Sequence, residues 1–286
     1  MVTQAVGSAF TMASDELDAI NKAINNQDLG QNGDKIRNVI KWMFMPDGQE
    51  PNGQRLGILS RNLGNLITAR ARNDNAAEDG SNVHWLTEDQ IVVYCNLDRF
   101  QKRDDGDWYD SDIDEAFSKN DAFGTCKGIE PTVAYTWVSD NTNKPSQVQL
   151  CPWFINWMKR VETKSLQDAE TKGLFYQAVS KGLTKLHALL TPIDVISLLD
   201  KVILHEFTHT RIGGESFDVD GPSFLNIRYG WNRCRKLAQE GTNDLRREPQ
   251  VNADSIALCG SDDANGLVAI RYIKEGKSVS ENGKVN

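Results

Sequence analysis

The sequence lacks features that mark several classes of protein. It has four histidines and five cysteines in 286 residues, with no C-x-x-C pair and no N-x-S/T sequon. The missing cysteine pairs argue against a structural zinc knuckle. No apolar run approaches the length of a transmembrane helix. The first residues, "MVTQAVGSAFTMASDE", have neither a basic start nor a continuous apolar stretch. They are not a signal peptide as written, and are compatible with a mature chain whose leader is absent.

Basic residues are fewer than acidic ones, with 32 Lys and Arg against 40 Asp and Glu. The formal net charge is −8 and the pI is about 5.1, which argues against nucleic acid or an anionic membrane as the main partner. A hydrophobic content of 39% with 25% charged residues is ordinary for a soluble globular protein. The cysteine spacing is compatible with two disulfides and one free thiol, or with five reduced thiols.

Apolar periodicity predicts helices in the first part of the chain. One is expected to begin at an N-cap, Ser14, and others are expected over 34–45 and 56–70. Strands are predicted for "QIVVYC", "PTVAYTWV" and "VQLC", the last two joined by a polar loop. The acidic stretch "RDDGDWYDSDIDE" lacks the Gly and Glu placement of an EF-hand loop, and is interpreted as a solvated loop.

Helices dominate the rest of the chain. They are predicted over 153–162 and 168–190, and for "YGWNRCRKLAQEG" and "PQVNADSIALCG". A further helix opens at Thr191-Pro192, carries an apolar stripe, runs into "HEFTH" and stops at Gly213-Gly214.

The motif "HEFTH" is the strongest chemical signal. On a helix, His205 and His209 lie one turn apart on nearly the same face, so both imidazoles can reach one zinc ion at about 2.0–2.1 Å. Glu206 is rotated away from coordination and can accept a proton from zinc-bound water. The alternative is a packed helix that holds two histidines by chance. Because the chain has only four histidines, the spacing favours the metal site.

A catalytic zinc site needs a third protein ligand and an open fourth position. The metzincin pattern requires Gly at 212 and a ligand at 215, where this chain has Ile212 and Glu215. The remaining candidates are a glutamate on a later helix or an aspartate shortly after the glycine pair. These candidates are Glu240, Glu248, Asp218 and Asp220.

The segment from Cys151 to Cys259 resembles the aspzincins, the deuterolysin-like zinc metallopeptidases that include peptidyl-Lys endopeptidases. The resemblance is carried by "LCPWF", "HEFTH", "HTRIGGESFD", "YGWNRCRKLA" and "VNADSIALC". It implies Asp218 as the third zinc ligand, with Asp220 as the next candidate. It also implies that Tyr229 donates a hydrogen bond to the oxyanion, and that Asp254 binds substrate. This chain departs from the family by about eight extra residues between Asp218 and Tyr229, and by Ala257 in place of a glutamate, which argues against strict Lys specificity.

The resemblance also implies secretion and disulfides. It favours a Cys126–Cys151 bridge, suggests Cys234–Cys259 as a second one, and leaves Cys95 free. The fold expected is α+β and predominantly helical, zincin-like, with a small β-sheet and the HExxH helix. We predict a single domain over 1–286. It would consist of an N-terminal helical part (1–80), a strand region with linking helices (81–190), and the zinc helix with the C-terminal helices (191–286).

The function predicted from these features is a secreted, monomeric, zinc-dependent endopeptidase with one Zn²⁺ per chain. It would act on protein or peptide substrates through water activated by Glu206, and bind neither nucleic acid nor membrane. The "PTVAYTWV" strand is a candidate cleft edge to which a peptide adds as another strand, with an ordinary buried strand as the alternative. Two other functions remain open: a catalytically silent zincin-fold protein that binds zinc or a partner, and a hydrolase acting on something other than protein.

Overall fold

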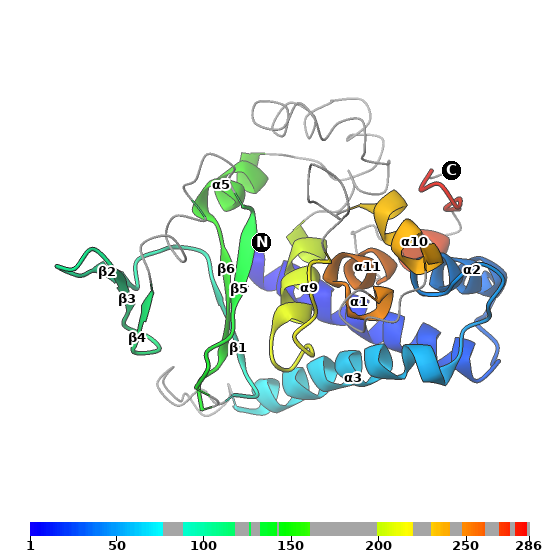
Figure 1. Ribbon diagram of the computed structural model, residues 1–286, viewed down its shortest axis with the longest axis horizontal. Helices are drawn as coiled ribbons and strands as arrows, with labels where there is room; N and C mark the ends of the chain where they lie inside the picture. The colour runs from blue at the N-terminus through cyan, green and yellow to red at the C-terminus, as the bar shows by residue number, and fades with distance from the viewer. Residues whose placement is uncertain are drawn as a thin grey trace.

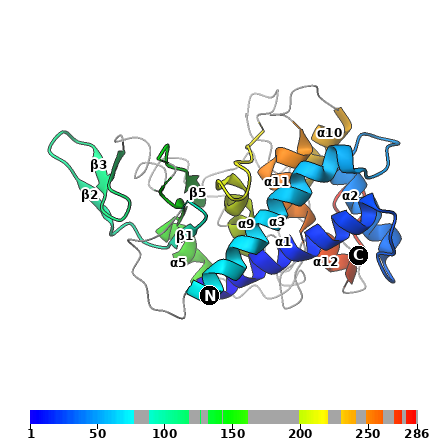
Figure 2. The same ribbon diagram turned by 90° about the horizontal axis from the view of Figure 1, so that it is seen from below.

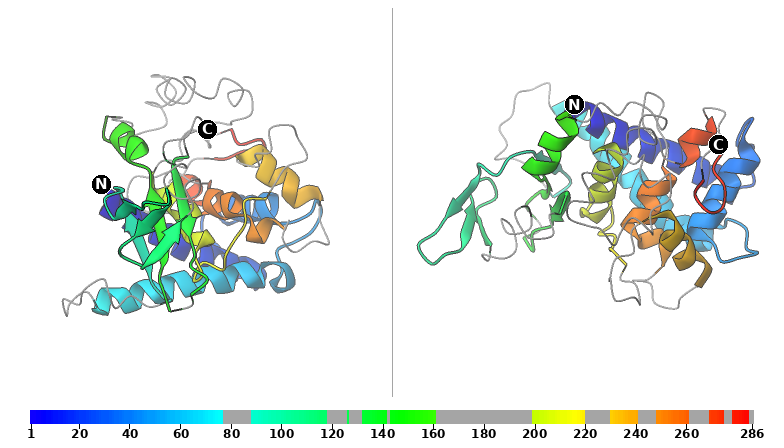
Figure 3. Two further views of the ribbon diagram at one scale, coloured as in Figure 1. Left: turned by 60° about the vertical axis from the view of Figure 1, so that its left-hand side comes forward. Right: turned by 90° about the horizontal axis from the view of Figure 1, so that it is seen from above.

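The computed structural model describes residues 1–76, 88–117, 126, 132–141, 143–160, 199–219, 230–240, 248–260, 269–274 and 278–284. Three layers follow one another along its longest axis: a small sheet, a second small sheet, and a group of helices (Figure 1). The same order is seen from below in Figure 2 and from above in the right-hand view of Figure 3. The α+β class expected from the sequence is therefore confirmed.

Three N-terminal helices form the base of the helical part: α1 (Val2–Ile24), α2 (Gly33–Phe44) and α3 (Gly53–Ala76). α1 and α3 lie side by side (Figure 2). The predicted second and third helices are confirmed, whereas the predicted start of the first at Ser14 is wrong. Ser14 lies inside α1, because the buried stripe of Ile20 and Ala13 continues through Ala9 toward the N-terminus.

The central sheet has the strand order β1-β6-β5, from β1 (Ile91–Tyr94), β5 (Ala134–Trp137) and β6 (Ser146–Leu150). β6 is parallel to β1 and antiparallel to β5, so β5 is an edge strand in the described part of the chain. All three predicted strands are confirmed. β5 lies beside the helix that carries the HEFTH motif (Figure 1).

A second sheet, β2-β3-β4, overturns the prediction of a solvated acidic loop. It consists of β2 (Phe100–Lys102), β3 (Trp108–Asp110) and β4 (Glu115–Phe117). Arg99 is buried between the rings of Tyr94 and Phe100, with its Cζ atom 3.7 and 4.1 Å from their centroids, and Arg99 Nε is 2.7 Å from Asp110 Oδ2. One acidic residue of the stretch is thus neutralised inside the protein, while aromatic residues supply a small apolar cluster.

The remaining described helices are α5 (Pro152–Arg160), α9 (Leu199–His209), α10 (Trp231–Glu240), the 3-10 turn η4 (Pro249–Val251), α11 (Ala253–Cys259) and α12 (Ala269–Lys274). They confirm the prediction for "YGWNRCRKLAQEG" and, over its described part, that for 153–162. The single helix predicted for "PQVNADSIALCG" is instead divided at Asn252 into η4 and α11. The helix predicted over 168–190 and the start at Thr191-Pro192 lie outside the described residues. None of the described helices is long and apolar enough to cross a bilayer.

One of the two predicted disulfides is present. Cys126 and Cys151 are bonded, with their Cα atoms 5.3 Å apart, and Cys95 is free as expected. The Cys234–Cys259 bridge is wrong, since both are free and buried. The two thiols have different neighbours: Cys234 Sγ is 3.7 Å from Asp254 Oδ2, whereas Cys259 lies next to Glu16.

Candidate metal centre

The helix α9 presents its two histidines on one face, as the spacing predicted. The imidazole centroids of His205 and His209 are 4.8 Å apart, and their Nε2 atoms are 3.1 Å apart. Apolar residues of α9 hold the helix against the base of the fold, where the ring of Phe207 lies 5.1 Å from that of Phe10 on α1. The histidines are therefore carried by a helix that is packed into the core.

The glycine pair after the helix allows a tight reversal of the chain. α9 ends at His209, and the turn that follows contains Gly213 and Gly214, the latter at φ +91°. A Cβ atom on Gly214 would lie 2.0 Å from Asn62 Nδ2 on α3, and one on Gly213 would lie 2.0 Å from the Phe207 carbonyl oxygen. Only glycine can occupy these two positions, because any Cβ atom would clash with these neighbours. The turn brings the following segment back over the histidines.

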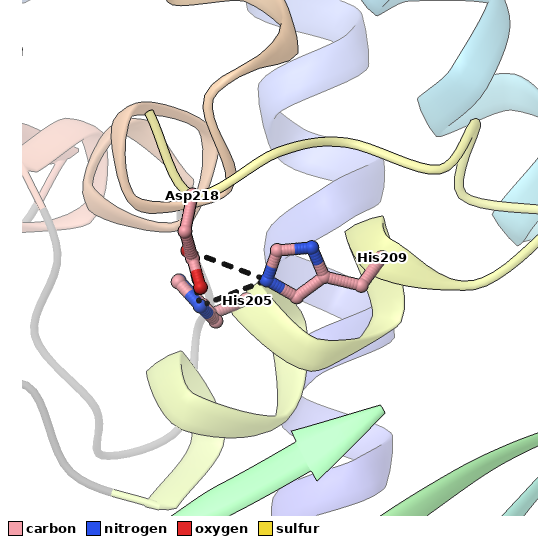
Figure 4. A group of neighbouring side chains, drawn as sticks. All are labelled: His205, His209 and Asp218. Carbon is pink, nitrogen blue, oxygen red and sulfur yellow. Dashed lines mark hydrogen bonds and ion pairs between the residues drawn. The ribbon is translucent and has the colours of Figure 1, made fainter. Parts of the chain in front are cut away.

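The returning segment, residues 216–219, is fixed by hydrogen bonds to residues 251–253, where η4 ends and α11 begins. The Phe217 amide donates to the Val251 carbonyl at 2.8 Å, and the Ala253 amide donates to the Phe217 carbonyl at 3.0 Å. The Val219 amide donates to Asn252 Oδ1 at 3.2 Å. This pairing aims the Asp218 side chain at the histidines (Figure 4).

Asp218 Oδ1 lies 3.2 Å from His205 Nε2 and 3.4 Å from His209 Nε2. With the 3.1 Å between the two nitrogens, the three donor atoms form a nearly equilateral triangle. Tetrahedral zinc ligands at about 2.0–2.1 Å from the metal stand about 3.3–3.4 Å from one another, so the triangle fits a zinc site. These three residues are also the only His/Cys/Asp/Glu group in the described part of the chain whose ligand atoms converge in this way.

Electrostatics favour a positive charge at the centre of this group. Burial lowers the pKa of His205, but its contacts with Asp218 and Asp254 and the nearby carboxylates raise the pKa to about 10. Burial raises the pKa of Asp218, but hydrogen bonds to both histidines and their charges outweigh burial and hold this pKa far below its ordinary value. A set of donors that stabilises a cation is what a divalent metal requires.

Each histidine has an acceptor near its other ring nitrogen. His209 Nδ1 is 2.6 Å from the Ser216 carbonyl oxygen, which can only accept, so Nδ1–H donates to it and Nε2 is the nitrogen available to a metal. His205 Nδ1 is 3.7 Å from Asp254 Oδ1. This arrangement orients both imidazoles with Nε2 toward the centre of the triangle.

Asp254, which the family resemblance assigns to substrate binding, lies behind His205 and contacts Lys201 and the Gly230 amide. The side chain is buried, Oδ1 is 2.8 Å from Lys201 Nζ, and Oδ2 accepts a hydrogen bond of 2.6 Å from the Gly230 amide. Burial raises its pKa, but the charge of Lys201 and the contacts with His205 and Gly230 hold the pKa well below its usual range. Asp254 therefore faces α9 and is not among the residues that line the cavity beside the histidines.

Glu206 is 5% exposed and lies at the wall of that cavity. Its Oε2 accepts a hydrogen bond of 2.7 Å from Thr136 Oγ1 on β5. Burial raises the pKa of Glu206, and the charges of His205 and His209 and the Thr136 hydrogen bond offset part of this effect. The net effect is a raised pKa of the Glu206 carboxyl group, which makes it a better proton acceptor than an ordinary glutamate.

The cavity has a volume of about 740 Å³ and runs along β5 over the three candidate ligands and Glu206. One wall is the strand segment 132–140, and the other is the segment that follows α9. The predicted residues His205, Glu206, His209 and Asp218 are thus brought together at one opening. Tyr229 and Asp220 lie outside the described residues.

The other candidate ligands lie elsewhere. Glu240 is exposed at the end of α10, 3.5 Å from Lys236, and Glu248 contacts Gln250. Sequence reasoning missed Thr136 and Lys201 as contacts of the site. Thr136 was marked only by its place in the predicted cleft-edge strand, and Lys201 only by its position one turn before His205 on the same helix.

Comparisons with family models, curated proteins and solved structures find no match for this chain. The arguments about its function therefore rest on the site itself.

Proposed function

We propose that this protein is a secreted, monomeric, zinc-dependent endopeptidase of the aspzincin type. The observation that carries the proposal is the triangle of His205 Nε2, His209 Nε2 and Asp218 Oδ1, with a buried glutamate from the same helix at the opening. In this proposal the three residues hold one zinc ion. When bound, zinc supplies Lewis acidity that polarises a carbonyl group and acidifies water in its open position.

Glu206 supplies the proton transfers. Oε2 is occupied by the Thr136 hydroxyl, whereas Oε1 makes no hydrogen bond in the described part of the chain. Oε1 is thus the atom that takes the proton from the attacking water and returns it to the leaving amine. A carboxyl group with a raised pKa suits both steps.

The edge strand β5 supports a polymeric substrate. Its residues line the cavity on one side, and an extended peptide can add to a free strand edge through backbone hydrogen bonds. Backbone pairing tolerates many sequences, which fits an endopeptidase acting on protein chains. The Cys126–Cys151 disulfide supports the extracellular location, because disulfides persist in oxidising compartments.

The test is hydrolysis of an unfolded protein by the zinc-loaded chain and by Glu206→Gln. We expect the variant to bind one zinc ion and to lose about 10²- to 10⁴-fold in kcat, the usual contribution of a general base. Glu50→Gln, which changes an exposed carboxylate far from the cavity, is the matched control. Equal cleavage by wild type and Glu206→Gln would refute the proposal. Zinc binding by a wild type that cleaves no peptide would favour the catalytically silent zinc-binding protein.

A further inference from the structure

Thr136 joins the edge of the central sheet to the glutamate of the HEFTH motif. The Val133 carbonyl accepts a hydrogen bond of 3.0 Å from the Cys151 amide, so the backbone groups of Val133 point toward the neighbouring strand. Backbone direction alternates along an antiparallel strand. The amides and carbonyls of Ala134, Thr136 and Val138 therefore point to the free edge of β5, where the cavity lies.

The Thr136 side chain stands out of the plane of the sheet, toward α9. Its Oγ1 lies 2.7 Å from Glu206 Oε2 and 2.9 Å from the Glu206 carbonyl oxygen. A hydroxyl has a single proton, which these two acceptors share. The contact holds the carboxylate at a fixed place relative to its own backbone. In the described part of the chain it is the one hydrogen bond made by the Glu206 carboxylate.

We propose that Thr136 is a positioning residue that holds Glu206 and also presents its backbone to the substrate strand. This inference rests on the proposed function. A peptide that pairs with the β5 edge would be fixed by the same residue that fixes the carboxylate. The position of the scissile bond relative to Oε1 of Glu206 would then be fixed by Thr136. General-base catalysis depends on such alignment of the reacting groups.

The test compares Thr136→Val, which keeps the branched shape and removes the hydroxyl, with Thr136→Ser, which keeps the hydroxyl. In the zinc-loaded protein we expect Thr136→Val to lower kcat about 10- to 100-fold, with KM within about twofold and one zinc ion still bound. Thr136→Ser should stay within about threefold of wild type. Thr68→Val, at an exposed threonine of α3, is the control for the same chemical change.

Crystal structures of the two variants give a readout that needs no activity. We expect the Glu206 carboxylate to leave β5 in Thr136→Val and to stay in Thr136→Ser. Unchanged kcat and an unmoved carboxylate in Thr136→Val would overturn the inference, as would a rise in KM alone. If wild type and all variants are inactive, the proposed function fails, and the place of Glu206 in Thr136→Val still decides whether Thr136 positions it.

Discussion

Lys201 Nζ lies 2.8 Å from Asp254 Oδ1, and the same carboxylate oxygen lies 3.7 Å from His205 Nδ1. The pair links three elements, because Asp254 also accepts a hydrogen bond from the Gly230 amide at the start of α10. A carboxylate behind a metal-binding histidine fixes the orientation of the ring and its basicity. The lysine keeps this carboxylate charged in a buried place.

We therefore expect Asp254→Asn to lower the zinc affinity about 10- to 100-fold, the usual effect of losing such a partner. The measurement is competition with a chelator of known affinity. Lys201→Met/Asp254→Asn, which removes both charges, separates loss of orientation from the cost of an unpaired lysine. An Asp254→Asn protein with unchanged zinc affinity and a raised KM would instead support the role in substrate binding that the family resemblance implied.

The third ligand can be identified in the same way. Asp218→Ala should weaken zinc binding at least about 100-fold, more than the loss of a residue that only orients a ligand. Glu215→Ala is the matched control, because Glu215 lies three residues away and is exposed. We expect its zinc affinity to stay within about twofold of wild type. Normal zinc affinity in Asp218→Ala would assign the ligand to another carboxylate, with Asp220 next in line.

Glu16 should make the stability depend on pH. Its carboxyl group is buried in α1, neither oxygen has a well-oriented hydrogen bond in the described part of the chain, and burial raises its pKa well above 4.5, with the Cys259 thiol offsetting only part. The stabilising contribution of the protonated Glu16 side chain is fully present below about pH 4.5, the ordinary pKa of a glutamate. It falls as the pH rises toward the folded-state pKa, because the unfolded chain ionises first. The loss reaches at most about 1.4 kcal/mol per pH unit.

Glu16→Gln removes this dependence. Urea unfolding of wild type and variant at pH 5, 6 and 7 should show a difference in unfolding free energy that grows in favour of the glutamine with pH. Glu50→Gln, at an exposed position, should show no such trend. A difference that stays constant over this range would mean that the pKa of Glu16 is not raised in the folded protein.

The Cys126–Cys151 disulfide should contribute substantially to stability. It closes a loop with a sequence separation of 25, for which the chain-entropy estimate is about 3–4 kcal/mol. Thermal unfolding of Cys126→Ser/Cys151→Ser should therefore occur at a clearly lower temperature than that of wild type. Cys95→Ser changes a free cysteine and is the control. Equal melting temperatures for the double variant and wild type would contradict the prediction.

Local sequence patterns were sufficient to predict helices and strands whose formation depends on the apolar spacing within a single element. The helices after Gly33 and Gly53 follow from their apolar period, and the strands follow from short β-branched runs. Periodicity did not predict the strands in the acidic stretch, because the burial of Asp110 at the end of β3 depends on Arg99, eleven residues earlier and just before β2. It also failed at Ser14, since a serine is a good N-cap residue but can also lie inside a helix whose apolar stripe continues past it.

The sequence by itself determined that His205 and His209 share a helix face with Glu206 between them, because the geometry of one helix decides this spacing. Only the tertiary structure decided which carboxylate faces the two imidazoles, that Asp254 turns toward Lys201, and that Thr136 holds Glu206. These contacts depend on how α9 packs between β5 and α11. The partners come from segments separated by up to 70 residues along the chain, and no local period encodes their distance.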